Sequence, residues 1–212
     1  MTFARESLPF VLVPGLLAVA LVALGVPGWS LAAAAVALAT LLFFRIPTRS
    51  FEGPPEVLVA PANGLVTRVD SVVDELVGQG EMHRVVIFLS VFDVHVQRSP
   101  VAGEVVASRH SPGRKVAAFR PDAGEVNESH LTVLRDSRGL LFGVKQIAGL
   151  LARRVVAYQG VGSRVERGQL IGLIKFGSRV DLMVPSSYRI EVQKGDRLRE
   201  GETPIARPDS IS

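Results

Sequence analysis

Uncharged residues dominate the start of the chain. One uncharged run of 19 residues covers Leu8–Val26, and a second run of 14 residues covers Leu31–Phe44. Pro27-Gly28-Trp29-Ser30 lies between the runs and is typical of a turn. A helix needs about 20 apolar residues to cross the hydrocarbon core of a bilayer. The pattern therefore predicts an N-terminal hydrophobic helical hairpin, with residues 1–48 as a membrane-associated unit.

Positive charges flank this hairpin. Arg5 precedes the first run, Arg45 and Arg49 follow the second, and the turn between the runs carries no charge. The positive-inside rule then predicts an inner (cell) membrane location with the polar domain on the cytoplasmic face. A signal peptide, a single anchor and a buried core hairpin are the alternatives. The length and doubling of the apolar stretch, and the lack of a clear small-residue cleavage site, oppose a signal peptide.

Short apolar runs separated by Gly and Pro follow from about residue 56. This spacing favours antiparallel strands, and no linker divides the region, so we expect one β-rich domain over residues 49–212. The predicted fold class is mainly β (α+β). The segment Ile147–Leu151 fits either one helical turn or a strand edge. The predicted strands are Val57–Val59, Gly64–Val69, Arg84–Leu89, Gly103–Ser108, Leu131–Asp136, Leu140–Val144, Arg154–Ala157, Leu170–Lys175, Arg179–Val184 and Arg189–Val192.

Composition narrows the class of protein. Hydrophobic residues make up 48% of the 212 residues, yet 21% are charged. Residues 1–45 carry only three of these charges, so the chain is neither a uniformly hydrophobic transporter nor a simple soluble domain. Cysteine is absent, which excludes disulfides, thiolate metal sites and a cysteine nucleophile. The net charge of +4 is too mild to identify a partner.

Common cofactor and metal motifs are missing from the sequence. It contains no phosphate-binding loop, no dinucleotide fingerprint and no nucleophile elbow. The four histidines lack paired ligand spacing, so we expect no metal site. Aromatic residues are 6% of the chain and are not interleaved with basic patches, which argues against a nucleic acid partner.

Three polar segments interrupt the apolar runs, and each alone has an ordinary interpretation. Asn63-Gly64 is a common hairpin turn. His95 fits a structural histidine in a strand, and Gly177-Ser178 fits a turn or a bulge.

Taken together, these segments resemble the phosphatidylserine decarboxylase family, in particular its short bacterial and archaeal branch. The resemblance covers nearly the whole chain. The residues that carry it are Phe43-Phe44-Arg45-Ile46-Pro47, Pro61-Ala62-Asn63-Gly64, Ser90-Val91-Phe92-Asp93-Val94-His95, Arg98-Ser99-Pro100-Val101-Ala102-Gly103, Pro112-Gly113, Asn127-Glu128, Gly168-Gln169 and Phe176-Gly177-Ser178-Arg179-Val180-Asp181.

The resemblance implies an enzyme that makes its own cofactor. The Ser178 hydroxyl would attack the Gly177 carbonyl, and β-elimination from the ester would give a β chain of residues 1–177 and an α chain of residues 178–212. Ser178 would become a covalent pyruvoyl group. That ketone would form a Schiff base with phosphatidylserine and act as the electron sink while CO₂ leaves, giving phosphatidylethanolamine. Glycine at the cleaved bond tolerates strained backbone and a close nucleophile.

The resemblance also implies roles for individual residues. His95 would transfer protons in maturation, in decarboxylation, or in both. Longer relatives have a second histidine where this chain has Arg98. Asp93 would be structural, orient the loop, or act directly. The implied partners are a phosphatidylserine lipid, with a diacyl or an ether backbone, the membrane, and the chain's own second fragment in a heterodimer that could form a higher oligomer.

Two positions depart from the family pattern. Asn63 stands where relatives have the Asp of an Asp–His–Ser maturation triad, and Ile46 stands where relatives have another Asp. An Asn can hydrogen-bond an imidazole but does not stabilise its cation by charge, and the same change in serine proteases costs about 10⁴-fold in rate. The alternative is therefore an uncleaved or non-catalytic membrane-anchored relative. A lipoyl-type carrier is a further rival, with Lys175 or Lys194 as the modified residue.

Overall fold

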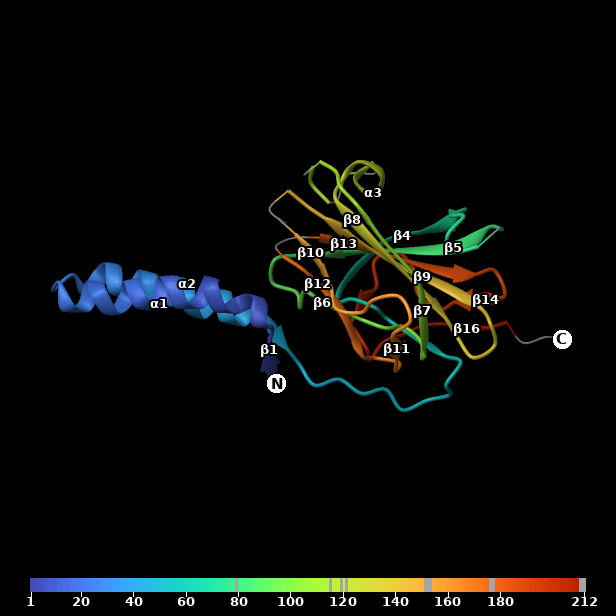
Figure 1. Ribbon diagram of the computed structural model, residues 1–212, viewed down its shortest axis with the longest axis horizontal. Coiled ribbons are helices and arrows are strands. Elements are labelled where there is room, and N and C mark those ends of the chain that lie inside the picture. The colour runs from blue at the N-terminus through green and yellow to red at the C-terminus, as the bar shows by residue number, and fades with distance from the viewer. Residues whose placement is uncertain are drawn as a thin grey trace. The chain divides into compact units, whose positions relative to one another are not determined.

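The computed structural model describes residues 1–78, 80–114, 116–118, 120, 122–150, 154–175 and 178–209. Its internal contacts divide the chain into two compact units, residues 1–48 and residues 49–212. Figure 1 shows the first unit as a helical hairpin and the second as a body of strands.

The first unit is the hydrophobic hairpin that the uncharged runs predict. Its two long helices contact each other along their length. The elements are β1 (Thr2–Phe3), the short 3₁₀ helix η1 (Arg5–Ser7), α1 (Leu8–Ala23), α2 (Pro27–Phe43) and β2 (Arg45–Ile46).

The predicted turn between the helices is wrong in position. Pro27 to Ser30 form the first turn of α2, and the chain reverses just before them, where Gly25 adopts a φ of +73°. Proline fits the first turn of a helix because its fixed φ is helical and its missing N–H has no partner there in any case. Glycine readily adopts the left-handed conformation that the reversal needs.

One helical stretch of the hairpin is long enough to cross a membrane. Arg5–Ala23 has 19 residues and the required apolar composition, whereas Pro27–Phe43 is shorter. Most large apolar side chains of the two helices are exposed, among them Leu16, Val19 and Leu31. The hairpin therefore presents an apolar surface rather than a packed core.

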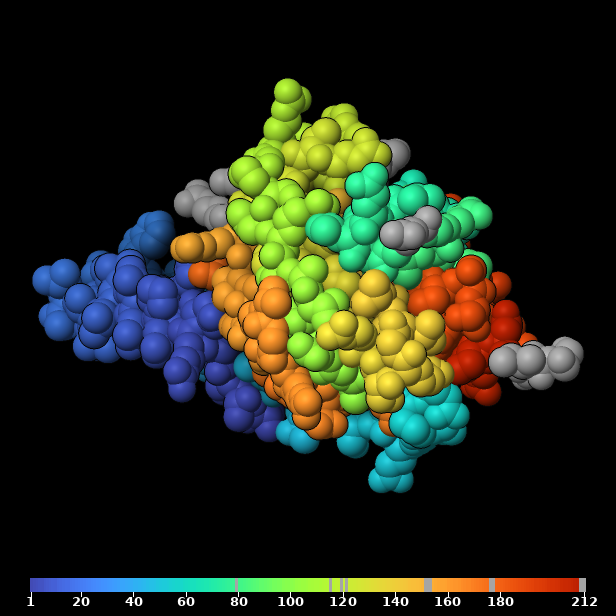
Figure 2. All heavy atoms as spheres, turned by 45° about the vertical axis from the view of Figure 1, so that its right-hand side comes forward, coloured from blue at the N-terminus to red at the C-terminus, as the bar shows by residue number. Residues whose placement is uncertain are grey.

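The second unit is built from antiparallel strands, as the sequence predicts. Eight of them form one sheet in the order β11-β7-β8-β9-β13-β5-β4-β15, and two three-stranded sheets have the orders β10-β12-β6 and β14-β16-β3. Figure 2 shows the orange segment around β11 against the green segment of β7, although the two are far apart in sequence. The elements are β3 (Leu58–Val59), β4 (Gly64–Val72), β5 (Met82–Leu89), β6 (Val96–Arg98), β7 (Gly103–Ser111), α3 (Ala123–Val126), β8 (Ser129–Arg135), β9 (Leu141–Ala148), β10 (Val155–Ala157), β11 (Arg164–Val165), β12 (Leu170–Ile174), β13 (Ser178–Pro185), β14 (Tyr188–Ile190), β15 (Arg197–Leu198) and β16 (Pro204–Pro208).

All ten predicted strands overlap observed strands, and the mainly β class is confirmed. The ambiguous segment that starts at Ile147 belongs to β9 as far as Ala148, and Leu151 lies outside the described residues. Short strands such as β6 and β15 are missed, because two or three residues show no alternation of apolar and polar positions.

The main core lies against one face of the eight-stranded sheet. In β13 the side chains of Val180 and Leu182 enter this core, while Met183 packs into a smaller cluster on the opposite face. Side chains alternate between the faces of a strand, so β13 is buried on both sides. A strand so enclosed is fixed in register, which fixes the position of its first residue, Ser178.

Candidate active site

Ser178 begins β13 between two neighbouring strands. Its Cα partners are Leu89 at the end of β5 and Ala148 at the end of β9. The side chain is fully buried, and among the residues that the structure describes its Oγ has no hydrogen-bond partner. A buried hydroxyl without a partner costs about 1–3 kcal/mol. Ser178 is therefore poorly explained by stability and well suited to a chemical role.

The bond that the sequence singles out, Gly177–Ser178, is only half described. Gly177 and Phe176 lie outside the described residues, so the geometry of the predicted cleavage is given from the Ser178 side alone.

His95 lies beside the strand that leads towards Ser178. Its backbone carbonyl accepts a hydrogen bond from the Ile174 N–H at 3.1 Å, four residues before Ser178. The ring is buried, and its Nδ1 lies 2.8 Å from the carbonyl oxygen of Asp93. A carbonyl only accepts, so Nδ1 carries the proton of the neutral ring. Nε2 is then left unprotonated, as a general base requires.

Asp93 holds the loop that carries His95. Its Oδ2 accepts hydrogen bonds from the backbone N–H and the hydroxyl of Ser90, both at 2.8 Å. Its own N–H donates to the Ser90 carbonyl at 3.0 Å, and Oδ1 lies 3.7 Å from Nη1 of Arg197. These contacts close a tight turn and account for Asp93 as a residue that orients the loop.

Asn63 enters the same edge of the sheet from β4. Leu65 is paired with Phe88, so Gly64 lies opposite Leu89, which is itself paired with Ser178. Gly64 and Ser178 are thus two strand spacings apart, about 10 Å. Glycine is required there, because a Cβ on Gly64 would lie 2.2 Å from the carbonyl oxygen of Phe88.

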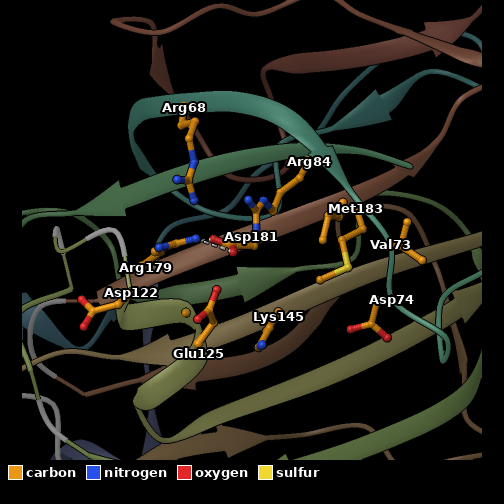
Figure 3. A pocket seen from close by; sticks show the side chains of 12 residues that line it. Arg68, Val73, Asp74, Arg84, Asp122, Glu125, Lys145, Arg179, Asp181 and Met183 are labelled. Carbon is orange, nitrogen blue, oxygen red and sulfur yellow. Dashed lines mark hydrogen bonds and ion pairs between the residues drawn. The ribbon is translucent and has the colours of Figure 1, made fainter. Parts of the chain in front are cut away.

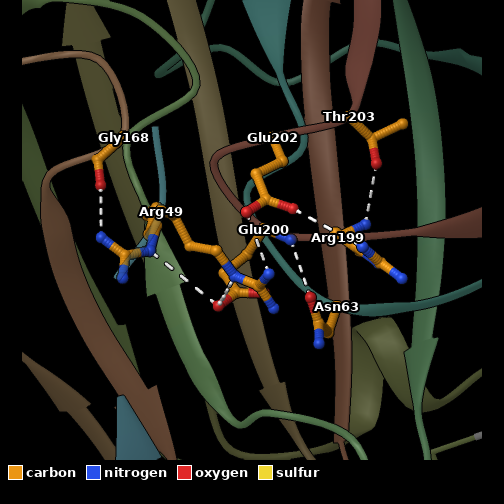
Figure 4. A network of polar contacts seen from close by, with 8 residues as sticks. Arg49, Asn63, Gly168, Arg199, Glu200, Glu202 and Thr203 are labelled. Carbon is orange, nitrogen blue, oxygen red and sulfur yellow. Dashed lines mark hydrogen bonds and ion pairs between the residues drawn. The ribbon is translucent and has the colours of Figure 1, made fainter. Parts of the chain in front are cut away.

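The Asn63 side chain is engaged by the C-terminal segment. Its Oδ1 accepts a hydrogen bond from the backbone N–H of Glu200 at 2.8 Å (Figure 4). Asn63 therefore lies at the edge of the sheet where Ser178 begins β13, while His95 lies beside the end of β12. The described bond of Asn63, however, is to Glu200.

Glu200 is a buried acid that sequence reasoning missed. Its Oε1 lies 3.3 Å from Nε of Arg49 and 4.0 Å from Nε of Arg98, and Arg49 also pairs with Glu202 (Figure 4). Burial raises the pKa of Glu200, and the charge of Arg49 opposes that rise. Burial also lowers the pKa of Arg98.

Asn63 and Arg98 thus both lie beside Glu200. The only sequence signal for this acid was the missing carboxylate at Asn63. No pattern pointed to the turn 199–203, because its burial arises from contacts with residues far away in the chain.

A second polar site lies on the other face of β13. Arg179 and Asp181 form a buried two-point ion pair, with distances of 2.6 and 2.7 Å, beside a cavity of about 500 Å³ (Figure 3). Arg84 and Lys145 also line it. Because side chains alternate along a strand, Arg179 and Asp181 point away from the face that Ser178 occupies. This cavity is therefore separate from the Ser178 site.

Among the residues that the structure describes, no three His, Cys, Asp or Glu side chains form a group that could hold a metal ion. The site offers the buried hydroxyl of Ser178, the ring of His95 in a defined tautomer, and, in the sequence, a peptide bond between Gly177 and Ser178.

The fold and the site together define a mainly β protein with a buried serine at the edge of its central sheet and a buried histidine beside the end of β12. Comparison with known proteins identifies the family. The model of the phosphatidylserine decarboxylase family matches residues 36–206. The chain belongs to this family, and the resemblance drawn from the motifs is confirmed.

Several curated relatives match almost the whole chain. The phosphatidylserine decarboxylase proenzyme of Symbiobacterium thermophilum is 44% identical over 206 residues, covering 96% of this chain and 94% of the relative. The proenzyme of Nocardia farcinica is 47% identical over 204 residues, covering 94% and 85%. That of Geotalea uraniireducens is 38% identical over 203 residues, covering 94% and 93%.

Proposed function

We propose that this protein is a pyruvoyl-dependent carboxy-lyase that decarboxylates phosphatidylserine to phosphatidylethanolamine. Membership of a family of enzymes supports the reaction, and its relatives are named proenzymes. The single observation that carries the assignment is the buried, unpartnered hydroxyl of Ser178 at the start of a central strand.

The residues fit a cofactor made from Ser178. A buried Oγ without a described partner is ready to attack a neighbouring carbonyl, and the strand holds it in register between Leu89 and Ala148. A pyruvoyl group at this position supplies a ketone that takes the amine of the serine head group and acts as an electron sink while CO₂ leaves.

Maturation uses only the chain's own atoms and one water. Ser178 Oγ attacks the carbonyl carbon of Gly177, the peptide C–N bond breaks, and an ester joins the two residues. Elimination then leaves a carboxylate on Gly177 and a dehydrated residue at position 178. Water adds to that residue and ammonia departs, which leaves the ketone at the N-terminus of residues 178–212.

His95 is the proposed proton carrier. Its Nε2, unprotonated in the tautomer that Asp93 imposes, takes the hydroxyl proton of Ser178 during maturation and returns a proton to the product. Asn63 contributes by holding the turn at Glu200, and its amide supplies no charge to the imidazolium. We therefore expect slow but complete maturation, since each molecule needs the reaction only once.

The two fragments stay in one heterodimer in this proposal. β13 belongs to the α chain and is hydrogen-bonded on one side to β5 and on the other to β9, both from the β chain. The hairpin of residues 1–48 would keep this heterodimer at the inner membrane, with the catalytic domain on the cytoplasmic face where its lipid substrate is reached.

The alternatives gain no specific support. An uncleaved scaffold leaves the cost of the buried Ser178 hydroxyl unexplained. A lipoyl-type carrier needs a lysine between hydrophobic residues at an exposed hairpin tip. Lys175 is half-buried, with its backbone N–H bonded to the Arg154 carbonyl, and Lys194 is exposed in a turn but lies between Gln193 and Gly195.

The test is lipid conversion by the purified full chain. Incubated with phosphatidylserine in mixed micelles, the protein should form phosphatidylethanolamine, and Ser178→Ala should form none. Ser186→Ala is the matched control, because Ser186 is an exposed serine in the turn after β13. Product formation by Ser178→Ala would refute the assignment.

A further inference from the structure

Exposed apolar side chains follow the ends of the two strands that flank Ser178. Ser178 is paired with the last residues of β5 and β9, Leu89 and Ala148, so all three lie at one edge of the sheet. The chain that leaves β5 carries Val91 and Phe92, which are 43% and 84% exposed. The chain that leaves β9 carries Leu150, which is 65% exposed.

The geometry of the first loop keeps its apolar tip outside. Asp93 closes the turn through Ser90, so the two residues between them project from a fixed base. The same Asp93 holds the His95 ring through its carbonyl oxygen. Asp93 therefore connects the exposed tip at Phe92 to the ring of His95.

A basic group lies beside this tip. Arg197 pairs with Asp93 and its side chain is 73% exposed, whereas that of Asp93 is 17% exposed. The positive charge of this pair therefore faces outward, while the carboxylate is turned inward.

We propose that Val91, Phe92 and Leu150 form an apolar rim that docks on an anionic lipid surface and brings a head group to the edge where Ser178 and His95 lie. Exposed aromatic and aliphatic side chains enter the boundary between head groups and acyl chains, and nearby Arg and Lys attract anionic lipid. The inference rests on the proposed function, since it takes the substrate to be a lipid. It adds a second membrane contact that is independent of the hairpin.

The test places a fluorophore in the rim. The chain has one tryptophan, Trp29, so Trp29→Phe combined with Phe92→Trp gives a single reporter at the tip. The full chain is reconstituted in vesicles of phosphatidylcholine and phosphatidylserine whose acyl chains are brominated. Bromine quenches tryptophan only at close range, so we expect several-fold quenching at position 92.

The matched control is Val161→Trp in the same background. Val161 is 65% exposed in a turn before β11, outside the rim. Equal quenching at positions 92 and 161, or no quenching at 92, would overturn the proposal. The tryptophan at position 92 could instead be buried against a second copy of the chain. Its fluorescence in lipid-free detergent would then show a buried tryptophan and would change with protein concentration, and this result would also overturn the proposal.

The preference of the rim for anionic lipid is tested by changing the lipid composition. Quenching at position 92 should fall when phosphatidylserine is replaced by phosphatidylcholine, and equal quenching would contradict the anionic preference. Lipid conversion is measured beside quenching in the reporter chain that keeps Ser178. Quenching without lipid conversion supports the rim and refutes the activity, whereas conversion without quenching does the reverse. Ser178→Ala in the same background should keep the quenching and lose the conversion.

Discussion

At the scale of single residues, Asn63 is held in a structural contact with Glu200. The amide oxygen of Asn63 satisfies the buried N–H of Glu200, while the carboxylate of Glu200 meets Arg49 and Arg98. A structural bond occupies Asn63 where the family pattern has an acid. The site therefore depends on His95 without a charged partner from that position.

Two substitutions at Asn63 separate its contribution to stability from its contribution to self-cleavage. Asn63→Ala removes the acceptor of the Glu200 N–H and should lower the free energy of unfolding by about 1–2 kcal/mol. Asn63→Asp keeps an acceptor and adds the charge that stabilises a protonated His95, so it should speed self-cleavage. Urea unfolding followed by circular dichroism and a time course of chain cleavage measure the two effects. An Asn63→Asp chain that cleaves no faster would contradict the triad role.

His130 makes the free energy of unfolding depend on pH. It is buried between β7 and β9, its Nε2 lies 3.0 Å from Ser108 Oγ, and burial together with the charge of His110 lowers its pKa. The unfolded chain then binds more protons than the folded chain below about pH 6.5, so stability falls as the pH falls through that range. His130→Gln should flatten this part of the curve of unfolding free energy against pH, and an unchanged slope would show that another group is responsible.

At the scale of elements, β13 links the two faces of the sheet. Val180 and Leu182 hold it in the main core, while Arg179 and Asp181 lie as a buried ion pair on the other side. The pair follows directly after Ser178, so it fixes the strand at the point where the proposed new N-terminus arises.

Removing one member of this pair should be costly. Asp181→Ala deletes the carboxylate that binds two nitrogens of Arg179, and breaking a buried pair costs about 3–5 kcal/mol. Met183→Leu, on the same face and nearly equal in volume, should cost less than about 1.5 kcal/mol. Both are measured by urea unfolding in a Ser178→Ala background, which keeps a single chain. Similar costs for the two variants would show that the ion pair does not anchor the strand.

The elements also show what the sequence could predict. Long strands such as β5 and β13 are recognisable because apolar runs and turn residues mark them. The start of α2 is misplaced because Pro27 suits both a turn and the first turn of a helix. Ser178 and His95 are found through motifs, whereas Glu200 is missed. Its burial and its ion pairs with Arg49 come from residues about 150 positions apart, which no local pattern encodes.

At the scale of the whole molecule, the proposed cleavage after Gly177 would divide the chain without dividing the sheet. β13, β14, β15 and β16 all follow the proposed cleavage point, and they pair with β5, β9, β4 and β3 from before it, or with each other. Glu200 adds ion contacts to Arg49 and Arg98 across the same division.

The two fragments should therefore behave as one particle. We expect them to co-elute from a gel-filtration column in mild detergent and to separate only in denaturant. Loss of residues 178–212 under native conditions would contradict the pairing of β13 described above.

The conversion of Ser178 into the cofactor is tested by measuring the intact mass of the purified full chain. We expect two chains, residues 1–177 and residues 178–212, the second lighter by one ammonia than a chain that begins with serine. Ser178→Ala should give one uncut chain. A single chain of full mass from the unaltered protein, or a second fragment with an ordinary serine N-terminus, would contradict the account.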